Sequence, residues 1–269
     1  EELEKEKMVF KSLDYKYFRD NFGLPDLSRK TTEQIVEVRR FLGVASLTVL
    51  TKPDMAVSFR SASNGSNESN TIKANAMVQI AINKALRAEA PRFNKGRFER
   101  AYKYALELTR NHTEFYPLIK NAFYDAGVIL VILPNLSGSK INGATKKIGK
   151  NIMLMVNERN LYADSFWFTL FHEIGHIMNG DYGISFEKET GERETAANQF
   201  AEDELIDKEK YRVFVNQKRY DVNSICIFAD SINRDPGIVL GRLRNDGLVE
   251  YTDVSLNRLK HKYRVVATT

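Results

Sequence analysis

The chain has a single cysteine, Cys226, so it cannot form an intrachain disulfide. We therefore expect a reducing compartment, with Cys226 as a small buried apolar residue. Long apolar runs are also lacking: the longest, Val128 to Leu133, is far short of the roughly 20 residues that a membrane-spanning helix needs. The first residues, EELEKEKMVF, contain no apolar stretch of the kind found in secretory signals. These absences exclude a membrane-spanning or disulfide-stabilised protein and favour the cytoplasm.

The composition is otherwise that of an ordinary globular protein. Hydrophobic residues make up 43% of the 269 residues and charged residues 28%, which is enough apolar content for a sizeable core. The chain starts with Glu rather than Met, so we expect a processed or truncated start. The net charge is +5 and the pI about 9.1, with one basic cluster between Arg258 and Arg264. That cluster is either a solvated helix end or a patch that contacts phosphates.

Hydrophobic periodicity predicts a mostly helical α+β protein with a small sheet between two helical regions. Apolar residues recur at helical spacing in three N-terminal segments, at 77–85, 98–106 and 115–123. A polar loop is expected at 61–70. The β-branched run at 128–133 predicts a buried strand, and the segments 141–147 and 152–157 flank a turn and predict a hairpin. We therefore divide the chain into a helical N-terminal region, a core and a helical C-terminal region, at 1–125, 126–215 and 216–269.

The most informative segment runs from Asp164 to Gly180, with the sequence DSFWFTLFHEIGHIMNG. Asp164 is a suitable N-cap and Gly180 a suitable C-terminal stop for a helix. On that helix an apolar stripe would consist of Trp167, Leu170, Phe171, Ile174 and Met178. His172 and His176 are one turn apart on the opposite side, so both imidazoles can bind one metal ion. Glu173 lies beside them, which completes the H-E-x-x-H pattern of metal-dependent hydrolases.

Catalytic zinc usually takes three protein ligands and keeps one position for water, so a third ligand is expected downstream. The candidates are Asp181, Glu187, Glu189, Glu192 and Glu194. Helical periodicity favours Glu194, because it shares a face with Ala197, Asn198, Ala201 and Leu205. The two alanines on this face would allow close helix packing. The other four stay open. Met153, Met155 and Met178 are expected to be core residues, since zinc prefers His, carboxylate and Cys ligands.

These residues resemble the ImmA/IrrE family of bacterial and phage metallopeptidases. The resemblance rests on FWFTLFHEIGH, followed 18 positions after His176 by Glu194 in ETAANQFA. Three further segments are similar to the family: FLGVAS at 41–46, INGATKKIG at 141–149 and DPGIVLGRL at 235–243. The resemblance extends from about Phe41 to about Tyr263.

The resemblance implies a gluzincin-like (zincin) core, with the small sheet packed on the active-site helix. It also implies Zn²⁺ bound by His172, His176 and Glu194, with Glu173 as the catalytic base. Family members typically cut or inactivate a helix-turn-helix transcriptional repressor of a phage, mobile element or stress regulon. Relatives often carry a Cro-type DNA-binding domain before the peptidase, and the first 30 residues of this chain are too few for one. Either that domain was lost or removed, or the repressor is a separate protein. We expect a DNA-binding repressor as the protein substrate, and the missing domain puts direct nucleic-acid binding by this chain in doubt.

Two rival functions stay open on sequence alone. One is a non-catalytic, antitoxin-like binding module with a structural or vestigial metal site, which an intact Glu173 argues against, because a structural site needs no such carboxylate. The other is a metal hydrolase for a non-peptide substrate. The strand at 152–157 either pairs with an extended substrate or is a plain core strand. Tyr182 is a candidate oxyanion donor, although a packing role fits it better.

The segment Ile225 to Leu243 has a helix-turn-helix rhythm. One helix is expected to end near Ile232, and a second to begin at Pro236 with Asp235 as its cap. Arg242 and Arg244 near its end could contact DNA. Because the second helix is apolar, a packing or substrate-recognition role is the better interpretation.

Overall fold

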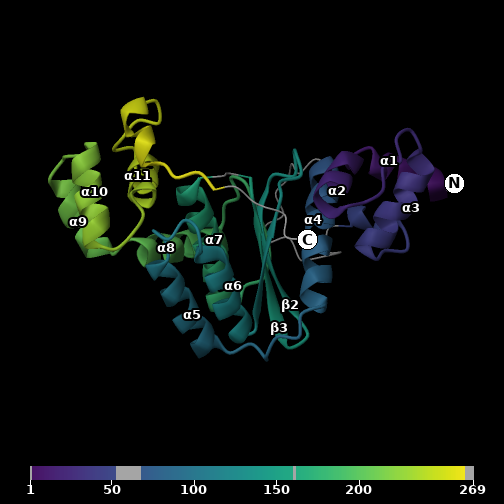
Figure 1. Cartoon of the computed structure of the whole chain (residues 1–269), viewed down its shortest axis with the longest axis horizontal. Coiled ribbons are helices and arrows are strands. Elements are labelled where there is room, and N and C mark those ends of the chain that lie inside the picture. Colours follow the sequence, from purple (N-terminus) through teal and green to yellow (C-terminus); the bar gives the residue numbers. More distant parts are fainter. Residues whose placement is uncertain (1, 53–67, 160–161, 264–269) are drawn as a thin grey trace.

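The computed structural model describes residues 2–52, 68–159 and 162–263. Most of these residues are in helices, and four strands form one small sheet (Figure 1), which confirms the predicted α+β class. The helices are α1 (Glu2–Phe10), α2 (Tyr15–Phe22), α3 (Thr31–Leu42), η1 (Leu47–Thr51), α4 (Glu68–Leu86), α5 (Lys95–Glu107), α6 (Phe115–Asp125), α7 (Ala163–Asn179), α8 (Glu192–Leu205), α9 (Lys208–Asn216), α10 (Val222–Ser231), α11 (Pro236–Asn245) and η2 (Val254–Leu259). The strands are β1 (Val128–Leu133), β2 (Ile141–Ile148), β3 (Asn151–Asn157) and β4 (Gly183–Phe186).

The strand order in the sheet is β1-β3-β2-β4. β1 pairs with β3 in parallel, and β2 pairs with β3 in the predicted antiparallel hairpin. β4, which pairs antiparallel with β2, was not expected, because helices were predicted from the hairpin to the end of the chain. β3 has a partner on each side, so the prediction that this strand could pair with a substrate is wrong. It is a central core strand.

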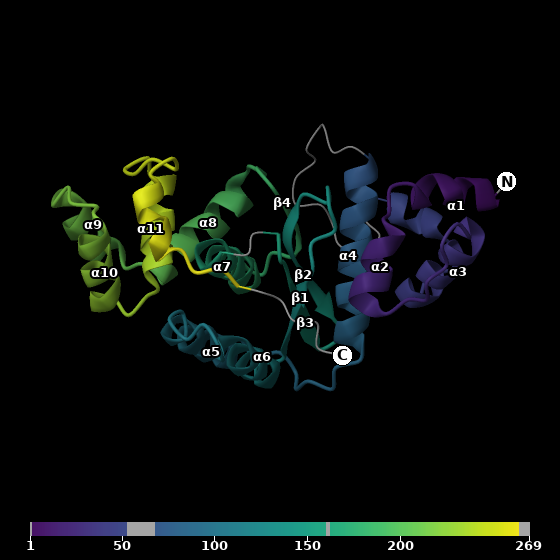
Figure 2. The ribbon, with the colours of Figure 1, turned by 45° about the horizontal axis from the view of Figure 1, so that its top comes forward.

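The sheet separates two hydrophobic clusters, because successive side chains of a strand point to opposite faces. One face contributes Ile129, Val131, Met153 and Met155 to a cluster shared with α1–α4, which confirms that both methionines are core residues. The other face packs against α5, α6 and α7. Figure 2 shows the sheet between α4 on one side and α5, α6 and α7 on the other.

Both clusters therefore contain helices from the predicted N-terminal region. The predicted helical faces at 77–85, 98–106 and 115–123 lie in α4, α5 and α6. Of the polar loop expected at 61–70, residues 61–67 lie outside the described residues, and Glu68 already begins α4. The division at 125/126 and 215/216 stays a prediction. No helix in the described part of the chain is long and apolar enough to cross a bilayer.

The C-terminal helices follow the predicted rhythm. Asp235 caps α11 by accepting a hydrogen bond from the Gly237 amide at 2.8 Å. Arg242 forms ion pairs with Glu202 and Asp246, and the Arg244 side chain is buried, so both arginines are engaged inside the molecule. Of the basic cluster at 258–264, Arg258 lies in the 3₁₀ turn η2, Lys262 forms an isolated β-bridge with Tyr162, and Arg264 lies outside the described residues. Cys226 is only partly buried, which corrects the expectation of a buried core cysteine.

Candidate metal centre

α7 carries the central motif, and its ends follow from its sequence. Gly180 adopts a left-handed conformation (φ 73°), and its amide donates to the carbonyls of His176 and Ile177, as predicted for a glycine stop. The N-terminal prediction is wrong by two residues: Tyr162 occupies the N-cap, and Asp164 lies inside the first turn. The predicted apolar stripe is buried except for Met178, which is half-buried. That packing fixes the rotation of α7 and therefore the direction of its histidines.

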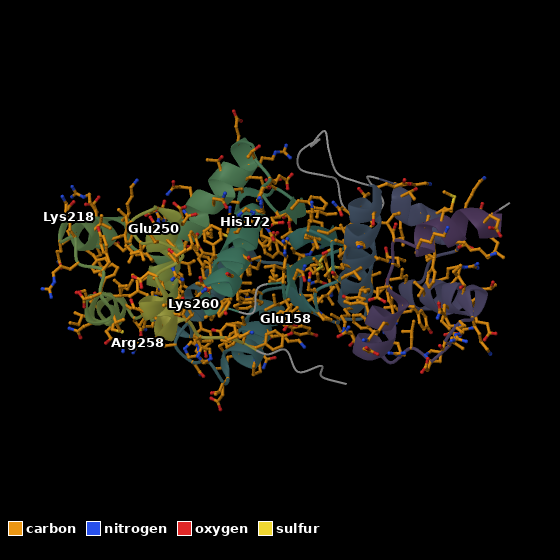
Figure 3. All side chains as sticks on the ribbon, turned by 90° about the horizontal axis from the view of Figure 1, so that it is seen from above. Glu158, His172, Lys218, Glu250, Arg258 and Lys260 are labelled. Carbon is orange, nitrogen blue, oxygen red and sulfur yellow. The ribbon has the colours of Figure 1, made fainter. Side chains whose placement is uncertain are left out.

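His172, His176 and Glu194 come together at the contact between α7 and α8. The Nε2 atoms of the two histidines are 3.0 Å apart. Glu194 Oε2 lies 3.1 Å from His172 Nε2, and Glu194 Oε1 lies 3.3 Å from His176 Nε2. All three residues are buried. Figure 3 shows His172 near the middle of the molecule, on α7.

These distances fit a metal ion. Three ligand atoms that each lie about 2.0–2.1 Å from a tetrahedral centre are about 3.3 Å from one another. The observed separations of 3.0 to 3.3 Å are close to that value. Two imidazoles and one carboxylate form a donor set that zinc accepts, with one position left for water. The residues present can therefore hold a metal ion, and they fit zinc.

Each histidine is oriented by a second partner. His172 Nδ1 donates to Asn198 Oδ1 at 2.8 Å, and His176 Nδ1 donates to Asp181 Oδ2 at 3.0 Å. Hydrogen bonding of Nδ1 directs Nε2 of each ring towards the cluster, which is the arrangement that metal-binding histidines need. Asp181, an open candidate for the third ligand, therefore has a positioning role instead.

Close packing of α7 on α8 places Glu194 within reach of the histidines. A Cβ atom at Gly175 would lie 3.1 Å from Phe200 Cβ and 3.2 Å from Ala197 Cα. Ala197 and Ala201 are fully buried in this contact region. The two small residues therefore allow the backbones to approach, as the periodicity argument predicted.

Glu173 is fully buried next to the cluster, against strand β2. A Cβ atom at Gly143 would lie 2.6 Å from Glu173 Oε1 and 2.7 Å from its Cδ. Only glycine leaves room for the carboxylate in this position. β2 therefore shapes the space occupied by Glu173, which sequence reasoning did not identify.

Electrostatics favour an ionised Glu194 beside the two histidines. Burial lowers the pKa of His172, but the hydrogen bond to Glu194 and the charges of Glu173 and Glu194 outweigh it, so the pKa is raised. For Glu194, burial acts to raise the pKa, but the hydrogen bonds from both histidines dominate and hold it well below its ordinary range. A buried carboxylate that stays charged is suited to binding a cation.

The remaining candidates lie elsewhere. Glu187 is exposed and pairs with Arg159 at 2.7 Å, Glu189 accepts a hydrogen bond from the Phe186 amide, and Glu192 is exposed. Tyr182 packs at the edge of the cluster around α7, with Lys147 5.1 Å from its ring centre. Asn198 was missed as a positioning residue, although it shares the predicted helical face of Glu194.

The family model of the IrrE N-terminal-like domain, peptidase family M78, matches residues 128–264. This range contains the whole His172, His176 and Glu194 cluster as well as strands β1 to β4. No curated protein and no solved structure matches the chain.

Proposed function

Because the chain belongs to the IrrE N-terminal-like family of M78 peptidases, we propose that it is a zinc-dependent metallopeptidase that cleaves a helix-turn-helix transcriptional repressor. The observation that carries the proposal is the convergence of His172, His176 and Glu194 beside Glu173. The resemblance to repressor-inactivating peptidases supports the choice of substrate. The engagement of Arg242 and Arg244 inside the molecule supports assigning DNA recognition to the repressor rather than to this chain.

The proposed roles follow from the geometry. His172, His176 and Glu194 would hold zinc, while Asn198 and Asp181 keep the imidazoles oriented. A zinc ion held there would supply Lewis acidity towards the scissile carbonyl and would lower the pKa of water. Glu173 takes the proton from the attacking water and passes it to the leaving amine. Its burial against Gly143 limits the positions that its carboxylate can adopt.

Replacing Glu173 by Gln tests this proposal. The change keeps the size of the side chain but removes the base, so we expect repressor or peptide cleavage to fall at least about 100-fold, with bound zinc unchanged. Glu192→Gln, an exposed carboxylate on α8, is the matched control and should leave both unchanged. Wild-type repressor inactivation in the Glu173→Gln variant would instead support the non-catalytic binding module.

A further inference from the structure

A cleft of about 530 Å³ lies beside the candidate metal centre. Its walls come from α7, the end of α8, α11 and the segment after η2. Two of its lining residues adjoin the centre: Phe168, whose ring centre is 6.4 Å from that of His172, and Asn142, the neighbour of Gly143. The volume is in the range of sites that bind small ligands or short peptide segments.

One end of the cleft contains charged side chains whose hydrogen-bonding groups are not all paired. Arg244 is 5% exposed, and its Nη2 donates to Asp253 O and Asn257 Oδ1. Within the described residues, however, its buried Nε has no hydrogen-bond partner, and neither does Asp164 Oδ1. A buried cationic group that is incompletely paired costs free energy, so an anion bound nearby would be favoured.

The charges of the cleft leave an excess of cations at that end. Arg159 pairs with Glu187, and Arg242 pairs with Glu202. Two lining cations remain, Arg244 and Lys260, and neither forms an ion pair with a carboxylate among the described residues. Lys260 Nζ instead lies 4.0 Å above the ring of Tyr162. Figure 3 shows Lys260 in the same part of the molecule as His172.

Asp164 is the only remaining lining carboxylate in the described part of the chain, so it can balance only one of the two cations. Burial raises the pKa of Asp164, while the charges of Lys260 and Arg244 act to lower it, so these three groups interact at this end of the cleft. The end of the cleft formed by Asp164, Arg244 and Lys260 therefore attracts an anion.

We propose that this cleft is a substrate subsite that takes an acidic side chain of the cleaved protein, with Lys260 as its specificity-determining residue. The inference rests on the proposed peptidase function. Lys260 Nζ donates a charge-assisted hydrogen bond to the substrate carboxylate, and the positive charge of the buried Arg244 guanidinium adds to the attraction. The apolar walls contributed by Phe168, Leu205 and Ile238 contact the substrate between this carboxylate and the scissile bond.

The geometry of α7 also predicts the position of the acidic residue. Asp164, Phe168 and His172 follow one another at intervals of one helical turn along a single face. At 1.5 Å per residue, Asp164 is about 12 Å from His172 along the helix axis. An extended peptide covers that distance in about three to four residues.

Calorimetric titration of the zinc-loaded full chain with peptide hydroxamates tests this subsite. The hydroxamate anchors each peptide at the metal. In one series the peptide extends from the N-terminal side of the hydroxamate, and in the other from its C-terminal side. Within each series, Glu is compared with Gln at each of five positions. We expect Glu to bind about tenfold more tightly than Gln three or four residues from the hydroxamate in one series. Lys260→Met should bind the Glu and Gln peptides with about equal affinity.

Lys262→Met is the matched control, because Lys262 lies in the same segment, 5.8 Å from the same Tyr162 ring, but does not line the cleft. It should retain the preference for Glu. Equal binding of Glu and Gln peptides to the wild type at every position would overturn the subsite while leaving the metal centre intact. If no hydroxamate binds in either series, the proposed metal centre itself fails and the subsite fails with it.

Discussion

At the scale of single residues, some members of the candidate centre can be identified from the sequence and others cannot. His172 and His176 are evident from their spacing, and Glu194 follows from the helical face that it shares with Ala197. Gly143 gave no signal, because its importance arises only when β2 packs against α7 and its missing side chain makes room for Glu173. Asp164 was misplaced for a related reason: a local capping preference does not reveal that the chain turns into the helix at Tyr162.

Gly143→Ala tests the contact between β2 and Glu173. The new Cβ would lie 2.6 Å from Glu173 Oε1, and the flexible end of Glu173 can move more easily than the backbone. A shift of about 1 Å in a catalytic group can cost about 100-fold in rate, so we expect a loss of cleavage of that order. Bound zinc and the melting temperature should stay near wild type.

Gly96→Ala serves as the control, because its Cβ would meet only ordinary contacts at 3.6 Å or more. Cleavage by the Gly143→Ala enzyme at the wild-type rate would show that Glu173 does not depend on this contact.

At the scale of secondary-structure elements, long periodic segments were predictable and short ones were not. The helices α5, α6, α7 and α11 and the hairpin of β2 and β3 all contain strong apolar patterns or turn signals. β4 has only four residues, between a helix stop and an acidic loop, and its pairing with β2 depends on the arrangement of the whole sheet. The same argument explains why the role of β3 stayed open in the sequence. The sequence shows that this strand is apolar, but not that it has partners on both sides.

Ala197→Leu tests the close contact between α7 and α8. Ala197 is fully buried, and its Cα would lie 3.2 Å from a Cβ at Gly175, so the larger side chain must push α8 away. We expect unfolding free energy to fall by about 1–3 kcal/mol in urea titrations. Zinc affinity, measured by competition with a chelator, should fall as well, because α8 also carries Glu194.

Ala196→Leu is the paired control, since Ala196 is exposed on the same helix. If Ala197→Leu bound zinc as tightly as Ala196→Leu, the position of Glu194 would not depend on this packing.

At the scale of the whole molecule, the sheet joins parts of the chain that sequence analysis treated separately. The region that matches the family model begins at β1, yet α4 packs on one face of that sheet, and α5 and α6 pack on the other. Tyr263, the last described residue, also contacts α7, because its hydroxyl accepts a hydrogen bond from Trp167 Nε1 at 2.9 Å. The cleft between α7, α8 and α11 belongs to this scale, and no local pattern could reveal it.

The pH dependence of stability is expected to reflect Asp235, which is buried at the start of α11 beside His112. Burial raises its pKa from 3.8 to about 6. Between these values the folded state binds the proton and the unfolded state releases it, so stability falls as pH rises. In urea titrations, the unfolding free energy of the wild type should therefore fall between pH 4 and pH 7. We expect this fall to be smaller in Asp235→Asn, by on the order of 2 kcal/mol.

Asp221→Asn gives the comparison, because Asp221 caps α10 in the same way but is exposed, with a lowered pKa. An identical pH profile for wild type and Asp235→Asn would contradict the raised pKa of Asp235.

The most direct test of the account is the metal content of the purified full chain, measured by elemental mass spectrometry. The wild type and Glu192→Ala should each contain about one zinc ion per chain, and Glu194→Ala should lose most of it, because Glu194 lies against the two histidines and Glu192 is exposed. A wild-type chain that binds no metal even after zinc is added, or a Glu194→Ala chain that retains it fully, would contradict the proposed centre.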